Sequence, residues 1–203
     1  MKIKELKNKK MQKVNWGVLG GWILYTMGLS IIPNISWIPW YVFVVYAGVW
    51  AVSLFWFFLF LEENLSAKMQ KLMSELGTKC WIKEAESFFS EIFLFDLTSG
   101  YIYGLFALNP FYIQKLDLKE VEDVEVVISD IKGYITASVI CRIIWKCGKN
   151  DIYIQRHRKY HPMTWGCEAD LAYRESAEKL KEVILKLKIV AEARAEKEQQ
   201  VMN

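Results

Sequence analysis

The longest apolar stretch of the chain carries no charge. Between Lys13 and Glu62, 48 consecutive residues include no Asp, Glu, Lys, Arg or His. About 20 apolar residues already span the hydrocarbon core of a bilayer as a helix, so this stretch is long enough for two spans. Pro33-Asn34-Ile35-Ser36 interrupts it once. The pattern therefore predicts an α-helical transmembrane hairpin with spans of about residues 14–32 and 37–61.

Residues 62–77 continue with helical periodicity. Leu65, Met69, Leu72 and Leu76 recur at helical spacing, and Gly77 follows them. Because glycine commonly ends helices, the pattern predicts an amphipathic connector that prolongs the second span and stops at Gly77. Its apolar stripe can lie either on lipid or on the domain that follows.

From about residue 80 the periodicity changes to that of strands. Residues 88–97 are aromatic and β-branched, residues 98–100 read as a turn, and residues 101–106 repeat the strand pattern. Together these features indicate a hairpin. Further strands are expected at 121–128, 136–146 and 151–156. About seven antiparallel strands in consecutive hairpins predict a meander, either a small barrel or two packed sheets.

An amphipathic helix is expected to close the chain. Its apolar positions lie on one stripe at Tyr173, Ala177, Leu180, Ile184, Leu187 and Ala191. This stripe predicts docking across the open end or edge of the β domain. The expected parts are a basic N-terminus (1–13), the hairpin (14–61), the connector (62–77), the β domain with its helix (78–190) and a polar, fraying tail (191–203).

Seven meandering strands followed by one helix is the element order of the pleckstrin-homology (PH) superfold. Three segments carry a more local likeness: Asp96-x-x-Ser99-Gly100, residues 116–126 (LDLKEVEDVEV) and the helix around residues 176–180. In these segments the chain resembles uncharacterised bacterial two-span membrane proteins with a cytoplasmic PH-like domain. The resemblance covers residues 80–190 at most. It implies a PH-like small barrel closed by the helix, and it brings no catalytic residues.

Charge is distributed unevenly along the chain. Residues 1–13 hold six lysines against Glu5, a net of +5, whereas residues 62–203 hold 20 Lys and Arg against 22 Asp and Glu, a net of −2. The positive-inside rule places the basic flank in the cytoplasm, and two spans return the chain to that side. We therefore expect a multi-pass protein of the plasma (bacterial inner) membrane with both termini cytoplasmic. The alternative is a cleaved signal peptide ending near residues 28–30.

The two predicted spans carry small residues on their faces: Gly17, Gly21 and Gly28 in the first, and Ala47, Gly48 and Ala51 in the second. Small residues let helix backbones approach closely in lipid. Either the two spans pack on each other through these residues, or the residues form a seam between copies in a homo-oligomer. The spans contain no ionisable group, which argues against a transporter or proton relay.

The best candidate site is electrostatic. Residues 142–161 hold six cations against Asp151 alone: Arg142, Lys146, Lys149, Arg156, Arg158 and Lys159. Beside an anionic leaflet these residues could bind lipid headgroups or phosphate. The alternative is a solvated segment that balances the acidic stretch 117–125.

The sequence shows no catalytic signature. It lacks G-x-S-x-G, H-E-x-x-H, a phosphate loop and a dinucleotide fingerprint, so an enzyme is not expected. The four cysteines and two histidines lack the close pairing of a zinc site, and the cysteines read as free thiols of a reducing compartment. No metal, cofactor or nucleic-acid partner is expected.

These patterns favour a membrane-anchored, non-catalytic binding or adaptor module. Its PH-like domain would dock a protein or an anionic lipid at the cytoplasmic face. The alternative is a signal-responsive effector or pore-forming regulatory protein that oligomerises through its transmembrane hairpin.

Overall fold

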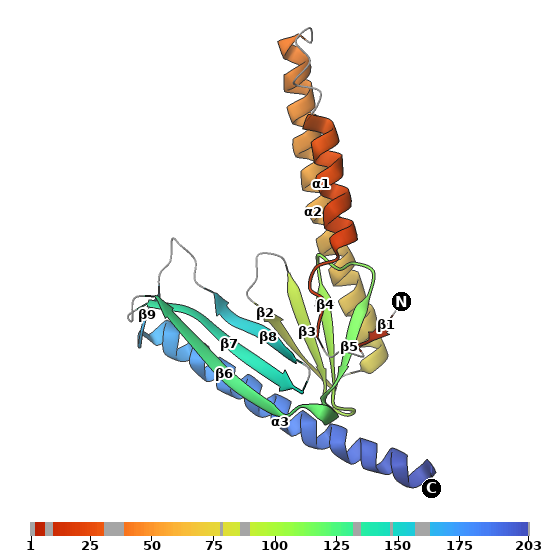
Figure 1. Cartoon of the computed structure of the whole chain (residues 1–203), viewed down its shortest axis with the longest axis vertical. Helices are drawn as coiled ribbons and strands as arrows, with labels where there is room; N and C mark the ends of the chain where they lie inside the picture. Colours follow the sequence, from red (N-terminus) through yellow and green to blue (C-terminus); the bar gives the residue numbers. More distant parts are fainter. Residues whose placement is uncertain are drawn as a thin grey trace.

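The computed structural model describes residues 3–6, 10–30, 39–77, 79–85, 90–131, 135–146, 148–156 and 163–202. The helices are α1 (Trp16–Ser30), α2 (Trp40–Leu76), the short 3₁₀ helix η2 (Leu118–Glu120) and α3 (Glu168–Met202). The strands are β1 (Ile3–Glu5), β2 (Cys80–Ala85), β3 (Glu91–Asp96), β4 (Tyr101–Phe106), β5 (Ile113–Asp117), β6 (Asp123–Ile131), β7 (Ile135–Trp145), β8 (Gly148–Arg156) and β9 (Met163–Thr164). Helices α1 and α2 form a stalk above the strands, and α3 runs beneath them (Figure 1).

The strands form two sheets. Sheet A has the order β1-β5-β4-β3-β2, in which β2 to β5 are an antiparallel meander and β1 joins β5 in parallel. Sheet B has the order β6-β7-β8, with β9 on β7. The predicted closed barrel is therefore wrong, and the alternative of two packed sheets is found. No ladder of hydrogen bonds joins the sheets in the described residues, because η2 leads the chain out of sheet A before β6 begins.

Sheet A is buried on both faces. In β3, Phe93 and Phe95 face a core shared with sheet B and α3, whereas Ile92 and Leu94 face α2. All four are at most 7% exposed. This explains why the strand reads as an unbroken apolar run, since alternation of polar and apolar residues requires one wet face. The predicted hairpin of β3 and β4 is confirmed, although Phe88 and Phe89 lie outside the described residues.

Helix α2 is continuous over 37 residues, a length of about 55 Å. Its lower half buries Leu65 and Leu72 against sheet A, so the predicted apolar stripe lies on the domain and not on lipid. The helix ends as predicted, because Gly77 has a φ of 72° and its N–H donates to the carbonyl of Met73 at 2.9 Å.

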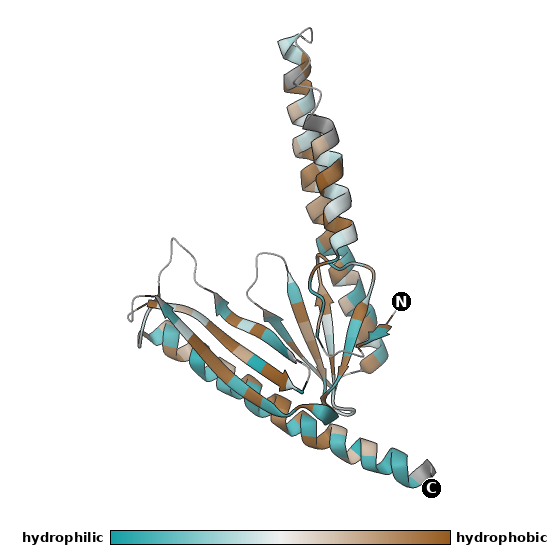
Figure 2. Ribbon diagram, in the orientation of Figure 1, coloured by the Kyte–Doolittle hydropathy of each residue, from teal (hydrophilic) through white to brown (hydrophobic). Residues whose placement is uncertain are grey.

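The upper half of α2 is exposed and contains no charge. Among the described residues, α2 is the one helix that is long and apolar enough to cross a membrane. Helix α1 is described over 15 residues, and the predicted turn at residues 33–36 lies outside the described part of the chain. Figure 2 shows the stalk in brown and pale colours, in contrast to the teal outer side of α3.

The N-terminal segment is built into the β domain, which the sequence did not predict. Strand β1 pairs with β5, and residues 10–15, which we name the N-terminal strap, follow. Met11 is only 7% exposed and lies in the core with Phe106. A Cβ at Gly104 would come within 2.8 Å of the Met11 sulfur, so this glycine leaves the room that Met11 fills.

Helix α3 buries most of the predicted stripe, since Ala177, Leu180, Ile184, Leu187 and Ala191 are all at most 2% exposed. The prediction is wrong for Tyr173, which is 37% exposed. The prediction that the chain frays beyond residue 191 is wrong, because α3 continues to Met202. Ion pairs within the helix, Lys188 with Glu192 and Arg194 with Glu198, accompany this extension. The polar composition of residues 191–203 did not reveal that Arg194 also binds the β domain.

The turn between β3 and β4 gives the first prediction. Gly100 has a φ of 70°, and a Cβ there would lie 2.6–2.7 Å from Ala191 and from the carbonyl of Leu187. Gly100→Ala should lower the free energy of unfolding by about 2–4 kcal/mol, because backbone strain and overpacking add. Gly77→Ala is the matched control, since φ is 72° but the space is open. It should cost only the backbone strain, about 1–3 kcal/mol, and less than Gly100→Ala. Equal losses, measured by thermal unfolding in mild detergent, would contradict the close approach of α3.

Candidate functional site

Arg142, at the centre of the predicted basic site, is neutralised by carboxylates. In β7 it lies directly opposite Glu125 of β6 and Asp151 of β8. Its Nε lies 2.7 Å and its Nη2 3.2 Å from the two carboxylate oxygens of Asp151, and its Nη1 lies 3.3 Å from Glu125 Oε1. The hydrogen bond to Asp151 is the main reason that the pKa of Arg142 is raised. Arg142 therefore ties three strands together and has little charge to offer an external phosphate.

The other cations of this site are arranged around the end of β7 and along β8. Lys146 and Lys149 are exposed at the turn between the two strands. Arg156 is the last residue of β8, and Arg158 and Lys159 lie outside the described residues. The contact of Arg142 with Glu125 fits the alternative prediction, in which this segment balances the acidic stretch 117–125.

Gly21, Ala47, Gly48 and Ala51 do not mediate the contact between α1 and α2. A Cβ at Gly21 or Gly48 would meet nothing within 4 Å, and Ala47 and Ala51 are exposed. The two helices instead stack Trp22 on Phe57, with ring centroids 5.5 Å apart.

Two glycines of α1 complete the predicted set. Gly17 lies at the start of the helix, where its N–H donates to Asn15 Oδ1 at 3.0 Å. Gly28 lies near the end of α1. Asn15 therefore caps the start of α1 by accepting from the Gly17 N–H.

The described cysteines are free thiols. Burial raises the pKa of the Cys141 thiol to about 12, so this cysteine is an inert part of the core. Within the described residues no three His, Cys, Asp or Glu side chains gather to hold a metal ion. Cys147, His157 and His161 lie outside that part of the chain.

A cleft of about 540 Å³ opens where the stalk meets the domain. Helix α2 forms one wall, β2, β3 and β8 form the second, and Tyr173 of α3 closes the end. Three carboxylates line it, from Glu62, Glu84 and Glu91, together with apolar side chains that include Leu65 and Met69. The net character is acidic and apolar. Sequence reasoning missed this cleft, because its lining comes from five separate segments of the chain.

The N-terminal strap borders the same region. Lys13 Nζ lies 2.6 Å from Glu91 Oε2 and 3.1 Å from the carbonyl oxygen of Asp151. The backbone of Gln12 is held by the side chain of Gln114, which accepts from the Gln12 N–H at 2.7 Å and donates to its carbonyl at 2.6 Å. Gln114 is only 1% exposed, so this amide replaces the backbone partner that a neighbouring strand would supply.

The loop between β4 and β5 contacts the last residue of the N-terminal strap and lies against α2. The carbonyl of Leu108 accepts a hydrogen bond from the Asn15 N–H at 2.9 Å. Pro110 and Tyr112 line a narrow cavity together with Leu61 and Lys68 of α2. Burial lowers the pKa of Lys68, whose ammonium has no hydrogen-bond partner among the described residues.

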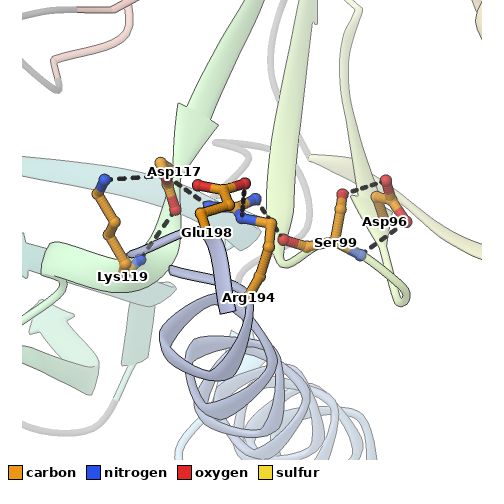
Figure 3. Close-up of polar contacts among 6 residues, drawn as sticks. All are labelled: Asp96, Ser99, Asp117, Lys119, Arg194 and Glu198. Carbon is orange, nitrogen blue, oxygen red and sulfur yellow. Dashed lines mark hydrogen bonds and ion pairs between the residues drawn. The ribbon is translucent and has the colours of Figure 1, made fainter. Parts of the chain in front are cut away.

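A polar cluster fastens α3 to sheet A, and it contains two of the three segments that carry the PH likeness (Figure 3). Arg194 donates to the carbonyl of Ser99 at 2.5 Å and to Asp117 Oδ2 at 2.6 Å. Its guanidinium also lies 3.9 Å from the centre of the Tyr101 ring. The cluster is therefore a structural clamp, in which one arginine joins the turn after β3 to the end of β5.

Asp96 organises that turn. Its carboxylate accepts hydrogen bonds from the hydroxyl groups of Ser99 and Thr98 and from the Thr98 N–H. Burial alone would raise the pKa of Asp96, but these hydrogen bonds outweigh it and hold the pKa below its ordinary value. The Asp-x-x-Ser-Gly motif is thus explained by turn geometry.

No family model, curated protein or solved structure matches this chain. The function is therefore argued from the geometry described above.

The cross-strand ion pairs give the second prediction. Arg142→Gln should lower the free energy of unfolding by about 1 kcal/mol, because a bidentate charged pair in a network is lost. It should leave anionic-lipid binding unchanged. Lys149→Gln, at an exposed position in the neighbouring strand, should leave stability unchanged. Thermal unfolding and vesicle co-flotation of both variants check this, and loss of lipid binding only in Arg142→Gln would show that Arg142 serves a ligand.

The third prediction concerns acid stability. Because the pKa of Asp96 is lowered by folding, its stabilisation is present above the ordinary value of 3.8 and is lost as the pH falls through the folded value. Ser99→Ala removes one donor and should shift this loss to higher pH. Unfolding midpoints measured between pH 7 and pH 2.5 test this, and identical profiles for Ser99→Ala and the unmodified protein would refute it.

Proposed function

We propose that this chain is a membrane-anchored, non-catalytic binding module. A two-span hairpin holds a PH-like domain at the cytoplasmic face of a plasma (bacterial inner) membrane, where the domain docks a protein partner. The observation that carries the proposal is the built junction between stalk and domain. Both chain segments that leave the stalk, the N-terminal strap and the lower half of α2, are packed on sheet A.

The strap also supports the proposed topology. Its hydrogen bonds to Gln114 and Asn150 require residues 10–15 and the β domain to lie on the same side of any membrane. If α2 crosses that membrane, the chain must cross a second time between Asn15 and Trp40. Helix α1 is the start of such a crossing, and the excess of lysines before it favours the cytoplasmic side.

The N-terminal strap and α2 both attach to sheet A, and this double attachment supports a function as an adaptor. A single flexible linker would let the domain tumble, whereas here α2 covers one face of sheet A and the strap inserts Met11 from the other. The domain is therefore held in one orientation toward the bilayer. Pre-organisation of this kind lowers the entropy cost of binding a partner.

The acidic cleft favours a protein partner over an anionic headgroup. Glu91 is already paired with Lys13, but Glu62 and Glu84 would repel phosphate. A segment with basic and apolar side chains would match both these carboxylates and the apolar wall. The neutralisation of Arg142 weakens the case for anionic lipid in the same way.

Gentle extraction of the full-length protein from its native membrane, followed by mass determination of the intact complex, tests the proposal. We expect a second protein in fixed stoichiometry. Glu84→Lys should remove it, whereas Glu63→Lys, at an exposed position of α2 outside the cleft, should retain it. A partner retained in both variants would refute the cleft as the docking site. Substrate turnover by the purified protein would refute a non-catalytic function.

A second function is favoured by the open faces at Gly21 and Gly48. Small residues that are not used within the hairpin could join copies of the chain into an effector or a pore. This alternative predicts a homo-oligomer that Gly48→Leu disrupts and Val49→Leu does not. A monomeric mass for the unmodified protein would exclude it.

A further inference from the structure

The loop between β4 and β5 exposes two adjacent aromatic side chains. Phe111 is 59% and Tyr112 is 37% exposed, and their rings contact each other at a centroid distance of 6.5 Å. Pro110 precedes them in the same turn. Nothing in the described part of the domain covers Phe111, although sheet A buries aromatic residues on its inner face.

The position of this loop relative to the stalk is fixed on two sides. The backbone of Leu108 is hydrogen-bonded to Asn15, directly before Trp16 begins α1. Tyr112 shares a cavity with Leu61, the last residue of the uncharged stretch in α2. The loop therefore lies beside Asn15 and Leu61, near the two ends of the uncharged stretch.

This level corresponds to the headgroup layer of a bilayer. The polar layers make up the difference between a total thickness of about 40–45 Å and a hydrocarbon core of about 30 Å. Phe111 is three residues from Leu108, a reach of at most about 11 Å. Trp16 is 71% exposed at the same level, and aromatic side chains with one polar end favour this layer.

We infer that residues 108–112 form a membrane-contacting loop, whose Phe111 and Tyr112 side chains insert into the lipid headgroup layer. The inference rests on the membrane anchoring in the proposed function. The Lys4 ammonium lies 5.7 Å from the centre of the Tyr112 ring. Its positive charge is offset by the negative charges of Glu62 and Glu63, which lie on α2 at the same level. Burial of aromatic surface, and not attraction to anionic lipid, therefore drives the insertion.

Spin labelling of the full-length protein in lipid nanodiscs tests the insertion. The label is placed at Phe111→Cys in a background of Cys80→Ser, Cys147→Ser and Cys167→Ser, while the fully buried Cys141 is retained. Leu97→Cys is the matched control. Leu97 is also apolar and 45% exposed, but it lies at the other end of β4, about 20 Å away. Val49→Cys, 55% exposed in the upper half of α2, reports on the span itself.

We expect the ratio of oxygen to nickel-chelate collisions at position 111 to be several-fold higher than at position 97. The ratio should be equal in zwitterionic nanodiscs and in nanodiscs with anionic lipid. Equal ratios at positions 111 and 97, with a lipid-like ratio at position 49, would overturn the insertion of the loop and leave the proposed membrane anchor intact. A water-like ratio at position 49 would overturn both the insertion of the loop and the proposed membrane anchor. A high ratio at position 111 in anionic lipid alone would overturn insertion driven by aromatic burial.

A second measurement leaves every side chain native. Phosphatidylcholine with a photoreactive group close to the glycerol is incorporated into the nanodiscs, and cross-linked sites are mapped by mass spectrometry. Labelling should concentrate at residues 110–112 and be absent from residues 97–100. Equal labelling of the two turns would contradict the inference.

Discussion

Sheet A has no face left for solvent, and the rest of the structure depends on this double burial. Leu94 is fully buried toward α2, and Phe95 is fully buried toward sheet B and α3. A sheet that is apolar on both faces must be covered twice, since each exposed face would cost about 25 cal/mol for every Å² of apolar surface. The continuation of α2 below the uncharged stretch supplies one cover. Sheet B and α3 supply the other, so the stalk is a structural layer of the domain.

The parts of the fold that depend on local patterns were predictable. The β3–β4 hairpin, the end of α2 at Gly77 and the apolar stripe of α3 follow from residue periodicity and from one glycine. The N-terminal strap was not predictable, because residues 10–15 have no periodicity and their side-chain partners are 78 to 139 residues away. The sequence left the choice between a small barrel and two packed sheets open for a similar reason. Strand patterns determine which face is buried but not which strand ends meet.

Charge counting found the basic segment but not its electrostatic state. Arg142 is neutral in effect because of the strand register, which places Glu125 and Asp151 directly opposite it on both sides. A count along the sequence cannot include partners from neighbouring strands. Phe111 and Tyr112 were difficult to interpret for a different reason. Their composition matches that of a buried strand, and only the contact of Leu108 with Asn15 and the cavity shared by Tyr112 and α2 place them beside the uncharged stretch.

The burial of Met11 has a consequence for the order of synthesis. Its backbone N–H binds Asn150, which is made 139 residues later. At about 5–20 residues per second this interval lasts roughly 7–28 s. During that time the Met11 N–H lacks the partner that it has in the folded domain. Residues 10–15 can therefore complete their contacts only after β8 has been made. If α1 and α2 cross a membrane, a chain with residues 10–15 on the far side from the β domain could not complete this core.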